Sequence, residues 1–72
     1  MRAMKILVEK HDDGYIAYPL GITGGCVGQG DSYAEALADC QGVLRAHIAT
    51  FGREALEEDS PVREAFVAEA YA

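Results

Sequence analysis

Cysteine and long apolar runs are both scarce in this chain of 72 residues. Two cysteines are too few for the disulfide framework that stabilises small secreted domains. No apolar run approaches the roughly 18 residues that a membrane-spanning helix needs. No leader-like stretch precedes Met4, so we expect no export and no membrane anchor. These absences indicate one cytoplasmic domain that covers residues 1–72.

The small size of the chain limits the core that it can build. A domain of this length buries only about 60% of the surface that its unfolded chain exposes, so a single core gives marginal stability. Small domains therefore often rely on disulfides, a metal or a partner subunit. An exposed edge strand adds a second reason to associate. We expect a homo-oligomer, either a dimer or a tetramer.

Basic residues are also few. Twelve acidic residues against six basic ones give a net charge of −6 at pH 7. Phosphate backbones repel such a compact anion, so we expect no direct nucleic-acid binding. A basic protein partner would be attracted, although the same charge also serves solubility alone.

The first half of the chain predicts three short strands. Met4–Lys10 alternates apolar and polar residues, with one apolar exception, which is typical of a strand. His11–Gly14 has the residues of a hairpin turn, Tyr15–Tyr18 is the return strand, and Pro19 ends it. Cys26–Gly30 is a third strand, weakened by its glycines.

One long helix follows the strands. Ser32 and Glu35 have the spacing of a capping box, and Gly52 has the place of the residue after the helix end. About 19 residues of helix are expected, packed across one sheet face by an apolar stripe at spacings of three and four. The stripe is Tyr33, Leu37, Cys40, Leu44, His47, Ile48 and Phe51.

The C-terminal third allows two interpretations. Arg53–Asp59 is charged and connective, with room for one more helical turn. The alanine content of Val62–Ala72 favours a helix. The alternation of Phe66–Tyr71 instead favours an edge strand or a strand exchanged between chains.

No pattern of residues predicts a metal or cofactor site. Cys40 and His47 lie seven residues apart on the expected helix, about 10.5 Å along its axis, and no Cys-x-x-Cys or His-x-x-x-His pair is present. Cys40 is better explained as a small core residue, and Cys26 faces it across the helix–sheet layer. We therefore expect no bound metal or cofactor.

Catalytic residues are not indicated either. His47 has no nucleophile or orienting acid beside it in any recognisable pattern. Asp12 and Asp13 are explained by the turn, and Asp31 by the helix N-terminus. Gly24–Gly30 lacks the third glycine of a dinucleotide fingerprint and the lysine of a P-loop. We expect a protein that is not an enzyme.

Three segments together resemble the HicB family of antitoxins. They are Gly14–Pro19, then Gly25–Ser32 with the string Gly-Cys-Val-Gly-Gln-Gly-Asp-Ser, then Glu35–Leu37. The helix segment Leu44–Ile48 is similar to the family as well. The likeness extends from Lys5 to Phe51, about two thirds of the chain.

This resemblance implies a small α+β domain with a partly degraded ribonuclease-H-like fold. The expected order is β-β-β-α-β, an antiparallel sheet with one long helix across one face and a last strand over Phe66–Tyr71. It also implies a non-catalytic antitoxin that covers the active site of a small basic RNA-cleaving toxin of the HicA type.

The chain departs from the family in two places. Many members carry a C-terminal DNA-binding domain, and the chain ends at Ala72, so we expect no operator binding. The loop Leu20–Gly24 differs from the usual Leu-Pro-Gly turn, which leaves open an orphan oligomeric domain with a structural or regulatory role and no toxin partner. The residues expected to meet a partner are Tyr15, Tyr18, Leu20, Ile22 and Gln29.

Overall fold

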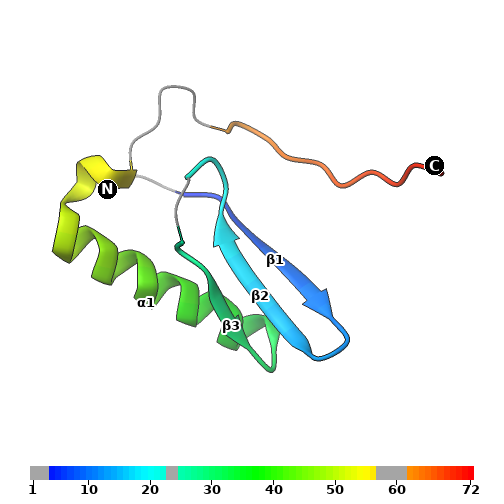
Figure 1. Ribbon diagram of the computed structural model, residues 1–72, viewed down its shortest axis with the longest axis horizontal. Coiled ribbons are helices and arrows are strands. Elements are labelled where there is room, and N and C mark those ends of the chain that lie inside the picture. Colours follow the sequence, from blue (N-terminus) through cyan, green and yellow to red (C-terminus); the bar gives the residue numbers. More distant parts are fainter. Residues whose placement is uncertain (1–3, 23–24, 57–61) are drawn as a thin grey trace.

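The computed structural model describes residues 4–22, 25–56 and 62–72. Within them lie the strands β1 (Ile6–His11), β2 (Gly14–Pro19) and β3 (Gly28–Gly30), then the helix α1 (Tyr33–Phe51) and the 3-10 helix η1 (Arg53–Leu56). The strands form an antiparallel sheet in the order β1-β2-β3, with α1 along one side of it (Figure 1). The predicted α+β class and the order β-β-β-α are confirmed.

The hairpin between β1 and β2 follows from its turn residues. The loop is only Asp12 and Asp13, and Gly14 has a φ of 145°, a conformation that side-chain-bearing residues rarely adopt. The pairing starts directly at His11 and Gly14. β1 therefore begins later and ends one residue later than the predicted span Met4–Lys10.

Proline at the end of β2 is tolerated because of where it falls in the ladder. The N–H of Leu20 donates to the carbonyl of Lys5 at 2.9 Å, which makes this a hydrogen-bonded pair. Such pairs alternate with non-hydrogen-bonded ones in an antiparallel ladder. The next pair, Ile6 and Pro19, is therefore a non-hydrogen-bonded pair. Proline has no N–H, and at this position β1 needs none from it. Pro19 is the last residue of the strand.

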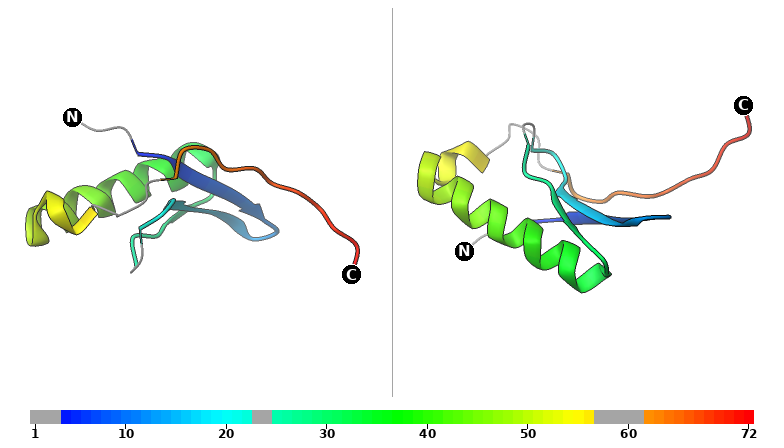
Figure 2. Two further views of the ribbon diagram at one scale, coloured as in Figure 1. Left: turned by 90° about the horizontal axis from the view of Figure 1, so that it is seen from above. Right: turned by 60° about the horizontal axis from the view of Figure 1, so that its bottom comes forward.

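The register divides the side chains of the sheet into two sets, because they alternate along each strand. The side that faces α1 includes Ile6, Val8, Tyr15, Ala17, Gly28 and Gly30. The opposite side, called the open face below, is made of Leu7, Glu9, His11, Ile16, Tyr18 and Gln29. No helix of the described residues covers the open face (Figure 2).

The helix has the ends that its sequence predicts. The N–H of Glu35 donates to the Ser32 hydroxyl at 3.1 Å, which is one of the two bonds of a capping box. At the other end Gly52 has a φ of 83°, and its N–H donates to the carbonyl of Ile48 at 2.7 Å. The predicted length and both boundaries of α1 are confirmed.

The buried stripe of α1 is shorter than predicted. The buried residues of the helix are Ala36, Cys40 and Leu44, whereas Tyr33 and Phe51 are mostly exposed. The prediction that these two aromatic residues enter the core is wrong, because α1 is closest to the sheet at its small residues rather than at its large ones.

Glycine in β3 sets this close approach. A Cβ atom on Gly28 would lie 2.2 Å from the backbone nitrogen of Cys40 and 2.7 Å from the carbonyl oxygen of Ala36. One on Gly30 would lie 2.5 Å from the Cβ of Glu35. The helix backbone therefore rests directly on the backbone of β3, and Ala36 and Cys40 are completely buried there.

The C-terminal segment, residues 62–72, forms neither a helix nor a strand and is exposed along its whole length. It leaves the domain as an extended chain (Figure 1). The predicted last strand over Phe66–Tyr71 is not formed in this chain, because no strand lies beside it in the described residues. The predicted extra helical turn exists as η1, while residues 57–59 lie outside the described part.

Candidate functional site

The open face is the side of the sheet that no helix of the described residues covers. Leu7 and Tyr18 are a cross-strand pair, and Ile16 lies between Glu9 of β1 and Gln29 of β3. Leu7, Ile16 and Tyr18 are half-buried, so they present apolar surface that is only partly shielded. The open face therefore combines partly exposed apolar side chains with polar and charged ones.

The carboxylate of Glu9 contacts two other side chains of the open face. The hydroxyl of Tyr18 donates to one oxygen of its carboxylate, and the Nε2 atom of His11 lies 2.8 Å from the other. The bond from Tyr18, followed by that from His11, lowers the pKa of Glu9 below its ordinary value of 4.5. The bond to Glu9 in turn raises the pKa of Tyr18 above 10.0. The face therefore carries a fixed negative charge at neutral pH.

Replacing Tyr18 with phenylalanine should destabilise the domain within a defined pH range. Because the pKa of Glu9 is lowered, the contribution of the bond is present above pH 4.5 and is lost as the pH falls through the lowered value. Because the pKa of Tyr18 is raised, the contribution is present below pH 10.0 and is lost as the pH rises through the raised value. Urea unfolding of wild type and Tyr18→Phe across this range checks the prediction. A difference that does not change with pH would contradict it.

The residues predicted to meet a partner fall in three places. Tyr18 and Gln29 both belong to the open face. Tyr15 lies on the other side of the sheet, where its ring packs against the core and the Nζ atom of Lys10 lies 6.0 Å from the ring centroid. Leu20 and Ile22 follow β2 and are half-buried.

Four residues of the open face were not predicted from the sequence to meet a partner, namely Leu7, Glu9, His11 and Ile16. A signal for them was present. A two-residue loop at Asp12 and Asp13 fixes the register, which pairs Leu7 with Tyr18 and Glu9 with Ile16. The spacing of three between Tyr15 and Tyr18 likewise places them on opposite faces of a strand.

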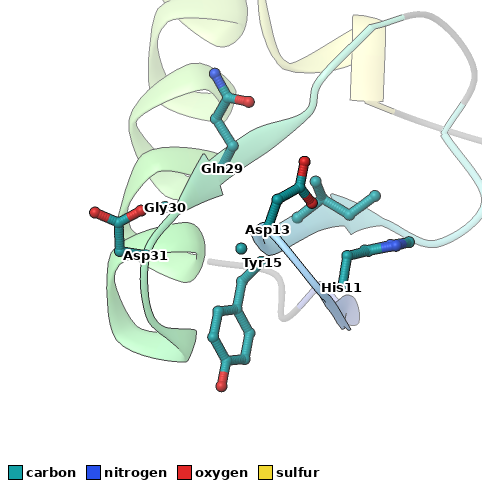
Figure 3. Close-up of a pocket in the computed structure, with 8 residues that line it drawn as sticks. His11, Asp13, Tyr15, Gln29, Gly30 and Asp31 are labelled. Atoms are coloured by element: carbon teal, nitrogen blue, oxygen red, sulfur yellow. The ribbon is translucent and has the colours of Figure 1, made fainter.

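A depression of about 380 Å³ lies where the hairpin end meets β3 and the start of α1. Two carboxylates and one imidazole line it, from Asp13, Asp31 and His11. Figure 3 shows that these side chains point in different directions instead of converging on one point. No group of three metal-ligating side chains is found in the described residues.

Both cysteines are buried in the helix–sheet layer and carry free thiols. The thiol of Cys40 points to the carbonyl oxygen of Cys26 at 3.9 Å. Burial raises the pKa of Cys40, so its thiol stays protonated at neutral pH and is a poor nucleophile or ligand. The prediction that Cys40 is a small core residue opposite Cys26 is confirmed. His47 is half-buried, and its ring centroid lies 4.9 Å from that of Phe51.

The two edges of the sheet differ. The N–H of Gln29 points outward from β3 and donates to a carboxylate oxygen of Asp39 on α1 at 2.9 Å. The outer edge of β1 has no such cover, since β1 pairs only with β2 in the described residues. The alternation of the ladder turns the backbone N–H and C=O groups of Ile6, Val8 and Lys10 toward this edge.

No helix of the described residues has both the length and the apolar character needed to cross a membrane. Comparison with known proteins gives no match: no family model, no curated protein and no solved structure is significantly similar to this chain.

Proposed function

We propose that this protein is a non-catalytic, HicB-like antitoxin domain of the cytoplasm, which binds a small basic RNA-cleaving toxin through its open face. The observation that carries the proposal is the uncovered sheet face, with its apolar residues around the ionised Glu9 carboxylate. Asp12 and Asp13 add negative charge at the hairpin end of this face. A basic partner would thus find both apolar contact and complementary charge there.

The resemblance of Gly14–Leu37 to HicB antitoxins supports the choice of partner. The net charge of −6 supports it too, because an RNA-cleaving protein must itself be basic to hold its substrate. The proposal includes a homo-oligomer and a last strand over Phe66–Tyr71 that forms only in the assembly.

Capture at low salt tests the proposal first. The tagged full chain is incubated with native lysate, and bound proteins are identified by mass after release with salt. A small basic protein that cleaves RNA, and stops doing so when the purified domain is added, would support an antitoxin. Recovery of the domain alone would contradict it and favour the orphan domain.

Two variants of one exposed residue then locate the contact. Gln29→Lys should weaken binding of the captured toxin about tenfold at low salt, because a positive charge on the open face opposes a basic partner. Gln29→Glu is the matched control and should bind at least as tightly as wild type. Both keep the backbone N–H that bonds Asp39, so the fold is unaffected. Equal affinities for both variants would place the contact elsewhere.

A further inference from the structure

The C-terminal segment 62–72, called the tail below, exposes several large apolar side chains. Phe66 is 85% exposed, Val67 87% and Tyr71 fully exposed. The tail is extended, and paired as a strand it would place Phe66, Ala68 and Ala70 on one side and Val67, Glu69 and Tyr71 on the other. It therefore has the backbone and the side-chain pattern of a strand without a neighbour.

The outer edge of β1 has backbone groups that a further strand could bind. Its backbone groups at Ile6, Val8 and Lys10 point outward, and no described strand binds them. β1 is six residues long, which matches the six residues of Phe66–Tyr71. The exposed backbone of an edge strand is a template for another strand.

We infer that two copies of the chain exchange their tails, each tail pairing as a strand with the outer edge of β1 in the other copy. The tail of each copy extends away from its own β1 and ends far from it (Figure 1). Charge favours the same edge, because Lys5 and Lys10 lie on or beside β1 while the tail carries Glu64 and Glu69. The other edge, at β3, is already bound through Asp39.

This inference specifies the contact within the proposed homo-oligomer and does not depend on a toxin. Because every copy supplies one tail and one β1 edge, two copies satisfy each other by a two-fold axis. The exchange buries the apolar side chains of the tail and completes the hydrogen bonds of β1.

Blocking the edge tests the exchange in purified protein. Lys10→Pro removes an outward N–H at an exposed position, and proline is tolerated on an unpaired edge. Light scattering should find wild type as a dimer, with at least a tenfold weaker dimer for Lys10→Pro. Lys10→Ala is the matched control, since it removes the same side chain but keeps the N–H, and it should stay dimeric. Circular dichroism of each variant checks that it is folded.

Blocking the tail tests the other half of the contact. Adjacent N–H groups of a strand point to opposite sides, so Val67→Pro/Ala70→Pro blocks whichever side pairs. This variant should be monomeric, whereas Val67→Thr/Ala70→Ser should be dimeric. A mixture of Lys10→Pro with Val67→Pro/Ala70→Pro retains one intact tail and one intact edge, and native mass spectrometry should detect the mixed dimer.

A monomeric wild type would overturn the inference. So would a dimer that persists in either proline variant, because another surface would then hold it. A mixture that remains monomeric would point to pairing within one chain and would overturn it as well. None of these results bears on the Gln29 variants, which report on toxin binding alone.

Discussion

Gly28→Ala should lower the free energy of unfolding by about 3 kcal/mol, at the upper end of what overpacking usually costs. The added methyl group would lie 2.2 Å from the backbone nitrogen of Cys40 and 2.6 Å from its Cα atom. These are backbone atoms of α1, so they cannot move aside as a flexible side chain would. The helix as a whole would have to shift, which would uncover the small core beneath it.

Urea unfolding followed by circular dichroism measures this effect, at one protein concentration because the proposed association would contribute to stability. Gly42→Ala is the control, because a Cβ atom there meets nothing within 4 Å and Gly42 lies inside the helix. It should stabilise the domain by about 0.5–1 kcal/mol. If the two variants were equally stable, helix and β3 would not be in direct contact.

Leu44→Ala should cost about 2.5–4 kcal/mol. Leu44 is the only buried residue with a large side chain among five described core residues, the others being Ala17, Cys26, Ala36 and Cys40. Its removal leaves a cavity between α1 and the sheet that these small residues cannot fill. A domain of this size has a total stability of only about 4–11 kcal/mol.

Thermal unfolding resolves the loss at Leu44 easily, because 1 kcal/mol shifts the Tm of such a domain by about 4–8 °C. The matched control on the same helix is Phe51→Ala. Phe51 is 65% exposed, and its loss should cost less than about 1 kcal/mol in spite of its larger side chain. A larger loss for Phe51 than for Leu44 would mean that the core lies closer to the helix end.

The parts of the fold that depend on local chemistry were predictable. The turn at Asp12–Gly14 and the helix limits at Ser32 and Gly52 follow from backbone conformations that few residues adopt or stabilise. The turn and the two helix limits divide the chain, and the predicted order of three strands and a helix follows from that division.

The parts that depend on contact distance were not predictable in the same way. Apolar periodicity selects large residues such as Tyr33 and Phe51, yet the position nearest the sheet is set by glycine across the layer. Ala36 is completely buried for that reason; it lies four residues before Cys40, but the predicted stripe of large residues did not include it. The bond between Gln29 and Asp39 joins two elements and has no local signal at all.

The candidate site was predicted from the sequence only in part. Tyr18 and Gln29 were selected from the sequence and do share the open face. Tyr15 was selected with them, although strand alternation alone separates it from Tyr18. The depression at the hairpin end has no sequence signature, because its lining comes from the hairpin and from β3, which are separate in the sequence.

The difference between the two sheet edges also bears on whether the sheet could grow into a filament. Sheets grow into filaments when each copy can accept a new strand on both sides. Here β3 is three residues long and its outward N–H at Gln29 is occupied by Asp39, so that side is a poor template for another strand. Growth is therefore confined to the β1 side. A dimer closed by the proposed reciprocal exchange would cover both of its β1 edges, while Asp39 occupies the outward N–H of β3 in each copy.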